Sequence, residues 1–240
     1  SPRTGASVGP AQPLRAARAE QAPLLVFPGQ RFSGSGPPLD LRQAPHSCKV
    51  DFGEAVSVSF VARWEALSTW SRIIDFGSGP ESDNVTISNF DKGRGLVADV
   101  YRSSSRKRLL IPGAIKVGVS QRYLFTVNSS GCMRLTREGV VLGELSAGYA
   151  PRDVARSRFL VGASSWPSDS RFQGHVADLK LWSGVVAWEI AFPEGQDFGE
   201  YAAKVMAMKA EPRPARGQEA TPSRAGARAQ AAPAAQEVPA

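Results

Sequence analysis

The chain has 240 residues, of which 42% are hydrophobic, and this is enough for one large all-β domain or two small ones. Its apolar runs are far shorter than the ~20 residues that cross a bilayer, so we expect no membrane span. No secretory signal is recognisable at the N-terminus, which predicts a fragment or a processed form. The net charge is +7, and residues 1–20 and 209–240 carry more than half of the excess. Because the basic residues are not interleaved with aromatic ones, we expect no nucleic-acid partner.

The two ends of the chain differ in composition from the middle. Residues 1–21 are rich in Ala, Arg, Pro and Gly, and residues 210–240 in Ala, Pro, Arg and Gln, which predicts a disordered arm and a disordered tail. Residues 193–209 are expected to form a short helix or an extension. The residues that support a helix lie at helical spacing: Phe198, Tyr201, Val205 and Met208. The folded domain is therefore expected at residues 22–192.

The first half of this domain contains short segments typical of β-strands. Residues 24–27 are expected to form the first strand, a Gly/Ser/Pro turn follows at 29–38, and residues 39–41 pair briefly. Residues 56–64 alternate between two faces, which is typical of a strand with one buried face. Residues 70–89 predict a hairpin of two strands around a turn rich in Gly, Pro, Ser and Asp.

The second half continues in the same way. Strands are expected at residues 95–101, 108–111, 121–128, 132–136, 140–145, 158–163 and 172–182. A bulge is expected near Ala177 and Asp178, because the alternation fails there. Roughly a dozen short strands without a useful helical period predict an all-β fold, namely an antiparallel β-sandwich of the jelly-roll type.

One dense group of basic residues lies in the middle of the chain, around Ser103-Ser104-Ser105. Its members are Arg102, Arg106, Lys107 and Arg108. We interpret the group as the solvated tip of a hairpin, the alternative being a site for a polyanion.

Four segments of the domain follow one another in an order typical of a single family. They are SVSFVARW at residues 57–64, WSRIIDFG with DNV at 70–85, CMRLTREG at 132–139, and LVGASSW with FQGHVADLKLW at 160–182. This ordered set resembles the laminin-G-like jelly roll of the concanavalin A-like lectin/glucanase superfamily. The resemblance implies a non-catalytic module that binds a glycan or a protein within a longer extracellular or cell-surface protein. The rival interpretation is a structural or assembly domain with no ligand of its own.

An enzyme is a third alternative, because glycan-cleaving members of the superfamily carry paired carboxylates at the spacing E-x-D-x-x-E. That spacing does not occur here, and the nearest acidic group, Glu194, Asp197 and Glu200, follows the last expected strand. With only His46 and His175, no Ser-His-Asp triad is recognisable either. We therefore expect no catalysis. A glycoside hydrolase with a displaced pair would need two carboxylates facing each other on the concave sheet, roughly 5 to 10 Å apart.

Calcium is the one cofactor that the resemblance implies, since some relatives hold one ion at the rim through carboxylate, amide and carbonyl oxygens. The candidate ligands are Asp75, Asp83, Asn84 and Asn89. In the alternative interpretation, Asp83 and Asn84 form turn hydrogen bonds with their own backbone, and Asp75 ties two strands together.

A sugar site needs an aromatic face for a pyranose ring and polar side chains nearby. Trp70 borders a turn, and Trp166 opens a polar loop that contains Asp169 and Arg171. These four residues are the candidate ligand-binding rim, although both tryptophans could instead be lids of the core.

Two further features bear on the compartment. Cys48 and Cys132 allow one disulfide without requiring it. Asn84 and Asn128 each begin an N-glycosylation triplet, which matters only in a secreted protein.

Overall fold

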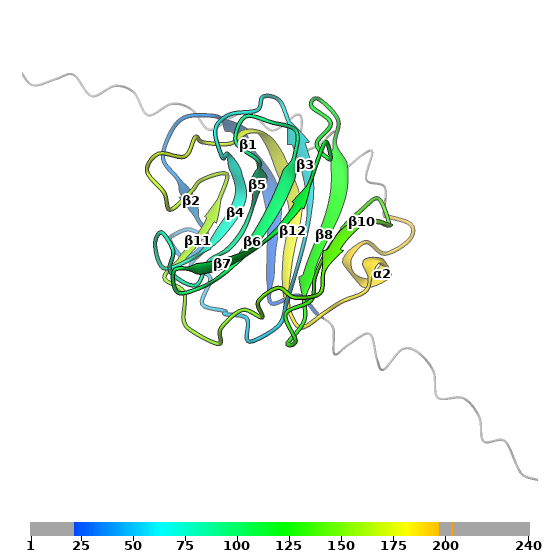
Figure 1. The fold of residues 1–240 in the computed structure, drawn as a ribbon. Coiled ribbons are helices and arrows are strands. Elements are labelled where there is room, and N and C mark those ends of the chain that lie inside the picture. Colours follow the sequence, from blue (N-terminus) through cyan, green and yellow to red (C-terminus); the bar gives the residue numbers. More distant parts are fainter. Residues whose placement is uncertain (1–21, 197–202, 204–240) are drawn as a thin grey trace, which may run out of the picture.

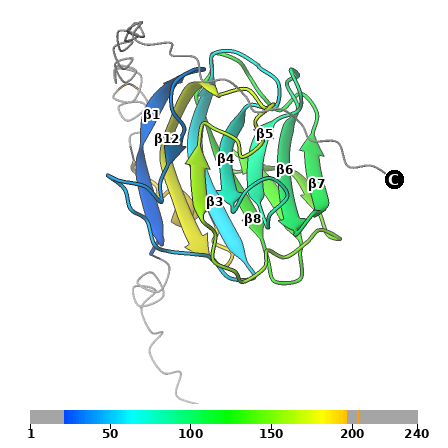
Figure 2. The same cartoon turned by 90° about the vertical axis from the view of Figure 1, so that its left-hand side faces the viewer.

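The computed structural model describes residues 22–196 and residue 203, and it contains two antiparallel β-sheets packed face to face (Figures 1 and 2). The predicted all-β antiparallel sandwich of a dozen strands is therefore confirmed. The predicted arm at 1–21, the predicted helix from Phe198 to Met208 and the predicted tail at 210–240 lie outside the described residues. Within the described part of the chain, no helix is long and apolar enough to cross a membrane.

Each sheet has six strands, and strands that are distant in sequence lie side by side. Sheet A contains, in spatial order, β1 (Leu25–Ser33), β12 (Gln173–Ser183), β3 (Val56–Trp64), β8 (Gln121–Val127), β9 (Met133–Arg137) and β10 (Val140–Leu145). Sheet B contains, in spatial order, β2 (Leu39–Asp40), β11 (Arg158–Val161), β4 (Arg72–Gly77), β5 (Val85–Asn89), β6 (Leu96–Arg102) and β7 (Ser105–Ile111). The predicted hairpin at residues 70–89 is the pair β4–β5, and the strands predicted at 132–136 and 140–145 form the antiparallel pair β9–β10.

The core between the sheets contains the apolar residues that alternate with polar ones along the strands. In β3, the expected inner face is fully buried: Val56, Val58, Phe60, Ala62 and Trp64. Tyr123 of the neighbouring strand β8 stacks on Phe60 with ring centroids 5.3 Å apart and meets Trp64 edge-on. Aromatic pairs of this kind contribute about 1 kcal/mol each beyond the burial of their surface.

The outer face of β3 is also buried, which the alternation alone does not predict. A short helix, α2 (Trp188–Ala191), and Phe192 pack over Val61 of β3 and Leu124 of β8 (Figure 1). The polar face that the alternation predicts for β3 is therefore not exposed to solvent. It is covered by α2 and Phe192, which come later in the chain.

The first strand is longer than predicted. β1 runs through Gly29 to Ser33, so the turn expected at 29–38 begins only after the strand ends. Gly29 has φ +140°, and a Cβ there would lie 2.8 Å from the carbonyl oxygen of Val176 on β12. The glycine therefore permits a close approach between two strands and does not form a turn. The bulge predicted near Ala177 and Asp178 is confirmed, because the register between β12 and β3 shifts there.

His175 lies on the outer face of β12, between Arg31 and Arg63 on the neighbouring strands. Burial lowers the pKa of His175 below its usual 6.5, and the two arginines act in the same direction. Glu65, whose Oε1 lies 3.5 Å from Nδ1 of His175, opposes them. Because the folded chain binds this proton less tightly than the unfolded chain, the stabilisation is present above about pH 6.5 and is lost as pH falls through the lowered pKa.

We therefore expect the melting temperature to fall less between about pH 7 and pH 5 in His175→Gln than in the wild type. The matched control is His46→Gln, because His46 is the other histidine of the chain and is exposed. Thermal unfolding followed by circular dichroism at both pH values measures the difference. A pH dependence that is the same in wild type and His175→Gln would contradict the buried neutral histidine.

Candidate functional site

The outer face of sheet B, which points away from the core, carries polar side chains in two neighbouring rows. Alternate residues of a strand point to opposite faces, so the register between the strands decides which of these side chains are neighbours. The first row runs across β4 to β7 and contains Asp75, Thr86, Asp99 and Arg108. The second row contains Arg72, Ser88, Val97 and Leu110.

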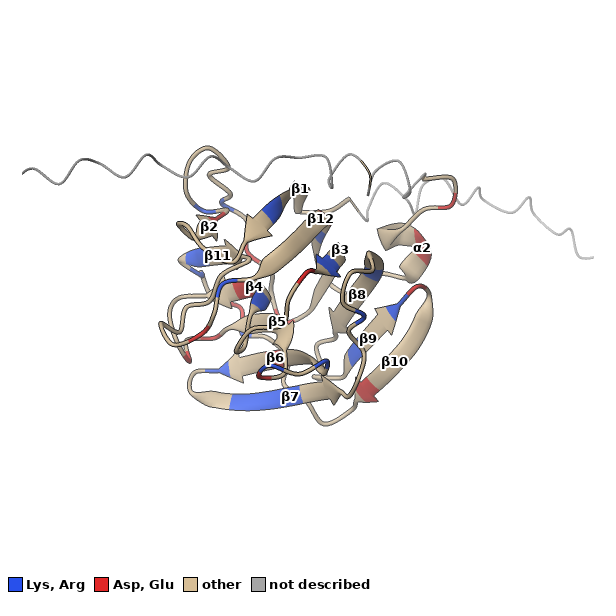
Figure 3. Ribbon diagram, turned by 90° about the horizontal axis from the view of Figure 1, so that it is seen from above, with Lys and Arg blue, Asp and Glu red and all other residues tan. Residues whose placement is uncertain are grey.

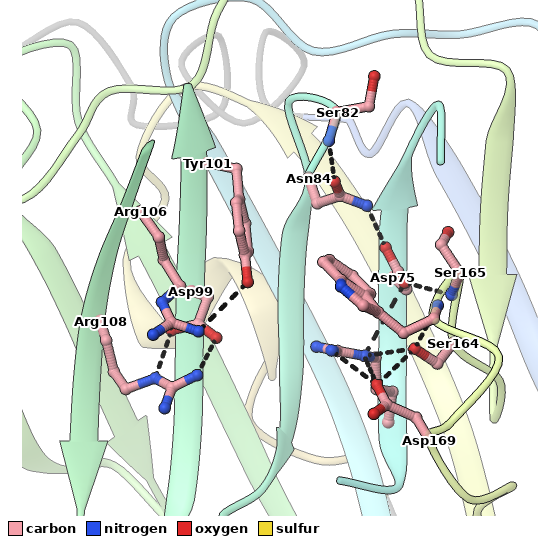
Figure 4. Close-up of polar contacts among 12 residues, drawn as sticks. Asp75, Ser82, Asn84, Asp99, Tyr101, Arg106, Arg108, Ser164, Ser165 and Asp169 are labelled. Atoms are coloured by element: carbon pink, nitrogen blue, oxygen red, sulfur yellow. Dashed lines mark hydrogen bonds and ion pairs between the residues drawn. The ribbon is translucent and has the colours of Figure 1, made fainter. Parts of the chain in front are cut away.

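Arg72 connects sheet B to the polar loop at residues 164–171. Its Nε and Nη2 donate to Asp169 Oδ2 at 3.1 and 2.8 Å, and Nε also donates to Ser164 Oγ at 2.8 Å (Figure 4). Its guanidinium carbon lies 4.4 Å from the ring centroid of Trp166. Arg72 is only 5% exposed, so this loop is fixed to the sheet by a buried, charge-assisted contact.

Asp75 holds the same loop and the turn between β4 and β5. Its Oδ2 accepts a hydrogen bond from the backbone N–H of Ser165 at 2.7 Å, and its Oδ1 accepts one from Nδ2 of Asn84 at 2.6 Å. Burial raises the pKa of Asp75, although Arg72 and the two hydrogen bonds act against the shift. Both carboxylate oxygens are thus engaged by groups of the protein itself.

Asp99 organises the other half of this face. Arg108 donates to both of its oxygens, from Nε and Nη2, at 2.8 Å each, and Nε of Arg106 lies 4.0 Å away. The guanidinium of Arg108 also lies 4.8 Å from the ring centroid of Trp70. Burial raises the pKa of Tyr101, which receives a hydrogen bond from Arg106, so its hydroxyl stays protonated at neutral pH.

Three buried polar atoms of sheet B on this face have no hydrogen-bond partner among the residues that the structure describes. They are Arg72 Nη1, Thr86 Oγ1 and Ser88 Oγ. Arg72 of β4 is the register partner of Ser88 of β5, and Thr86 lies two residues from Ser88 on the same face of β5. The three atoms are therefore close neighbours on the outer face of sheet B. Buried polar groups without partners are rare and costly, and each one requires an explanation.

The sequence around two of these residues carries a recognisable pattern. In Val85-Thr86-Ile87-Ser88, two small polar residues alternate with two core residues, which predicts a polar outer face. The basic group of the predicted hairpin tip divides between two surroundings. Lys and Arg follow one another along β7 (Figure 3). Arg106 and Arg108 contact Asp99 on the outer face, whereas Arg102 donates to the carbonyl of Ala150.

The four predicted calcium ligands are not brought together. Asp75 and Asn84 are in contact, but Asn84 precedes β5 and Asn89 ends it, so about 16 Å of strand separates the two. Asn84 Oδ1 accepts the backbone N–H of Ser82, and Asp83 Oδ1 accepts that of Ser103. The turn bond of the alternative interpretation is therefore present at Asn84, whereas Asp83 bonds the distant turn at Ser103, and Asp75 ties a turn and a loop together instead of two strands.

The donor set therefore does not fit calcium, which takes six to eight oxygen ligands at 2.3–2.6 Å. Among the described residues, no group of three or more His, Cys, Asp or Glu side chains could hold a metal ion. We expect the melting temperature of the chain to be the same in millimolar calcium and in chelator, because no folded-state site gains binding energy. A calcium-dependent rise that Asp75→Asn abolishes would contradict this prediction.

Three of the four predicted sugar-binding residues, Trp70, Trp166 and Asp169, contact arginines on the outer face of sheet B. Trp166 and Asp169 both contact Arg72, and Trp70 lies against Arg108. Trp70 and Trp166 are half-buried, so neither is a fully enclosed core residue. Arg171 ends the same loop and is also half-buried.

Two further sequence features can be compared with the structure. Cys48 and Cys132, which allow one disulfide without requiring it, are both free thiols. Asn84 is fully buried with its amide bonded to Asp75, so a glycan could not be attached to it in the folded domain. Asn128 lies partly exposed in the turn between β8 and β9, and its glycosylation stays a prediction.

The first row contains two carboxylates that could be mistaken for a catalytic pair. Asp75 on β4 and Asp99 on β6 are separated by one strand, which places their Cα atoms about 10 Å apart. A glycosidase needs one carboxyl group to protonate the leaving group and a second to attack the sugar or activate water. Here all four oxygens accept hydrogen bonds from Asn84, Ser165 or Arg108, so neither group is presented to a substrate.

Comparison with solved structures finds this fold in proteins of low sequence identity. The CBM40 of the Ruminococcus gnavus IT-sialidase, bound to α2,3-sialyllactose, matches with a TM-score of 0.60 and 14% identity over 71% of this chain and 98% of that chain. The NanB sialidase from Streptococcus pneumoniae matches with a TM-score of 0.59 and 9% identity, over 70% of this chain and 27% of its own. The leech intramolecular trans-sialidase matches with a TM-score of 0.58 and 12% identity, over 79% of this chain and 29% of its own.

These structural similarities show the fold alone, whereas a match to a sequence-family model identifies the family. No curated protein matches the chain. A family model described as the concanavalin A-like lectin/glucanases superfamily matches residues 41–189, which is more than half of the chain and includes β3 to β12. The protein therefore belongs to the concanavalin A-like lectin/glucanases superfamily.

Proposed function

We propose that this domain is a non-catalytic carbohydrate-binding module and that its glycan binds on the outer face of sheet B. The observation that carries the proposal is the group of three unpartnered buried atoms, Arg72 Nη1, Thr86 Oγ1 and Ser88 Oγ. A folded chain keeps such atoms at a cost in stability, and a ligand rich in hydroxyl groups would satisfy them.

The chemistry of the three atoms fits an acidic sugar. Arg72 Nη1 is a charged donor, which binds a carboxylate more strongly than a neutral hydroxyl, and the hydroxyls of Thr86 and Ser88 can donate or accept. A matching fold supports this choice, because the CBM40 of the R. gnavus IT-sialidase binds sialyllactose, whose terminal sugar carries a carboxylate. We therefore propose an acidic oligosaccharide as the ligand.

Access to these atoms depends on Trp166, because its ring lies against the guanidinium of Arg72. Movement of the ring away from Arg72 would make Arg72 Nη1 and the hydroxyls of Thr86 and Ser88 accessible to a ligand. The ring would then offer its face to the C–H groups of the sugar, which is the contact that aromatic residues make with pyranoses. Asp169 would keep Arg72 oriented through Nε and Nη2 while Nη1 binds the ligand.

The absence of catalysis is part of the proposal. Asp75 and Asp99 are the only carboxylates of the first row, and groups of the protein occupy the oxygens of both. An extracellular or cell-surface location belongs to the same proposal, because it follows from the family resemblance and from the glycan ligand.

The test is an array of sialylated, uronic-acid-containing and neutral oligosaccharides probed with the full chain. We expect binding to acidic members and weakening of about tenfold by Ser88→Ala, which removes one ligand hydrogen bond. Ser59→Ala is the matched control, because Ser59 Oγ is equally buried and unpartnered but lies on the outer face of sheet A. Failure to bind any glycan would contradict the proposal and favour a structural or assembly domain.

A further inference from the structure

Trp70 is held in a backbone conformation that bulky residues rarely adopt. Its φ is +50°, in the left-handed region that favours glycine. Its N–H donates to the carbonyl of Asp91 at 3.0 Å. Asn89 supports the same turn, since its Nδ2 donates to the carbonyls of Ser68 and Asp91 and its Oδ1 accepts from Ser71. A residue predicted as a calcium ligand thus serves to position an indole ring, and strained residues of this kind cluster at functional sites.

The Trp70 ring belongs to a group of apolar side chains at one end of sheet B. Phe90 meets it edge-on with ring centroids 5.0 Å apart, and Phe90 is 40% exposed. Leu110 of β7 is 38% exposed, and a Cβ built on Gly95 would lie 3.1 Å from both Leu110 and Phe90. We name this group, Trp70, Phe90 and Leu110, the apolar platform.

Arg108 supplies the polar edge of the apolar platform. Its guanidinium lies 4.8 Å from the ring centroid of Trp70 and 5.9 Å from that of Phe90. Its charge is already balanced by the two hydrogen bonds to Asp99. Arg72 is paired with a carboxylate in the same way, but it keeps one buried donor atom without a partner, Nη1, and Arg108 has no such atom among the described residues. The apolar platform therefore suits a neutral sugar better than a second acidic one.

The apolar platform is continuous with the site at Arg72. The second row leads in register from Arg72 through Ser88 and Val97 to Leu110, so the charged donor and the apolar platform share one face of the sheet. Ser88 and Val97 are fully buried, and the exposed part of this row is Leu110. Adjacent strands lie about 4.8 Å apart, so the row spans about 14 Å from β4 to β7, which is the length of two to three linked sugars.

We propose that the apolar platform is a second sugar subsite, which takes the neutral sugar adjacent to the acidic one. This inference rests on the proposed function. The apolar face of a neutral pyranose lies against Trp70 and Phe90, and Leu110 covers its edge. The acidic subsite at Arg72 thereby determines which terminal sugar is bound. The apolar platform makes the affinity for an oligosaccharide higher than the affinity for its terminal sugar alone.

The test compares 3′-sialyllactose with free N-acetylneuraminic acid by isothermal titration calorimetry on the full chain. If the array identifies another acidic oligosaccharide, that oligosaccharide and its acidic terminal sugar replace the pair. The expected result is that the wild type binds the oligosaccharide more tightly, and that Phe90→Ala and Leu110→Ala each weaken it about fivefold while the single sugar is unaffected. Leu24→Ala is the matched control, because Leu24 is 39% exposed against 38% for Leu110 and lies beside sheet A.

The outcomes separate this inference from the proposed function. Equal affinity of the wild type for the oligosaccharide and for the single sugar would overturn the second subsite and leave the acidic subsite intact. An affinity difference that survives in Phe90→Ala and Leu110→Ala would also overturn it. Lack of binding by either compound and by every array member would overturn the proposed function, and the subsite with it.

Discussion

Replacement of Arg72 by methionine should lower the free energy of unfolding by about 3 kcal/mol and abolish glycan binding. The stability loss follows because removal of one partner of a buried ion pair leaves the other partner, Asp169, without its counter-ion. Asp75 loses the favourable charge of Arg72 as well. Binding is lost because Nη1 is the proposed donor to the acidic sugar. Urea unfolding and calorimetric titration on the same preparation measure the two effects.

A buried arginine elsewhere in the domain provides the control for Arg72. Arg156 is 2% exposed and donates to the carbonyls of Asp83, Phe52, Val154 and Arg152. Burial lowers its pKa to about 10, and the carboxylates of Asp51 and Asp83 oppose that shift. Arg156→Met should therefore destabilise the fold to a similar extent yet retain glycan binding. Undiminished binding by Arg72→Met would contradict the role of Nη1.

Thr86→Val should have opposite effects on stability and on binding. The valine keeps the shape of the side chain and removes a buried hydroxyl without a partner, so the free energy of unfolding should rise by about 1 kcal/mol. Affinity for the acidic oligosaccharide should fall about tenfold, because one hydrogen bond to the ligand is lost. Thermal unfolding and calorimetric titration provide both values.

The control for this second variant is Thr126→Val on the outer face of sheet A, which should leave glycan binding unchanged. A loss of stability in Thr86→Val would show that the hydroxyl has a partner within the fold. Unchanged affinity would show that the ligand does not reach β5. A rise in stability together with a fall in affinity is the trade-off expected where a polar atom is kept for ligand binding at a cost in stability.

Much of the fold can be predicted from local sequence patterns. The strand at residues 56–64, the pairing of β9 with β10 and the bulge near Asp178 each depend on neighbours in the chain, and these three predictions are confirmed. The single buried face predicted for residues 56–64 is wrong, because both faces of β3 are buried. Gly29 shows the limit of such patterns. A glycine at this position predicts a turn from local sequence. The structure needs glycine there because β12, almost 150 residues away in the sequence, approaches too closely for a Cβ atom.

The candidate site depends on the same kind of long-range contact. The segment from Trp70 to Gly77 contains Arg72 and Asp75, but their partners Asp169 and Ser165 lie 97 and 90 residues further along the chain. Asn84 and Asn89 carry oxygen atoms of the type that calcium prefers, and only the folded arrangement shows that protein donors occupy them. Residue types at turns therefore identify polar atoms without showing whether those atoms remain available for a ligand.

The most direct test is a crystal structure of the chain with the tightest-binding acidic oligosaccharide from the array. We predict that the acidic group lies within about 3.2 Å of Arg72 Nη1, which is hydrogen-bond distance, with hydroxyls of the sugar bonded to Thr86 and Ser88. The Trp166 ring should have moved from its place against Arg72. An oligosaccharide bound on sheet A, or on sheet B with Arg72 Nη1, Thr86 and Ser88 still unpartnered, would contradict the account.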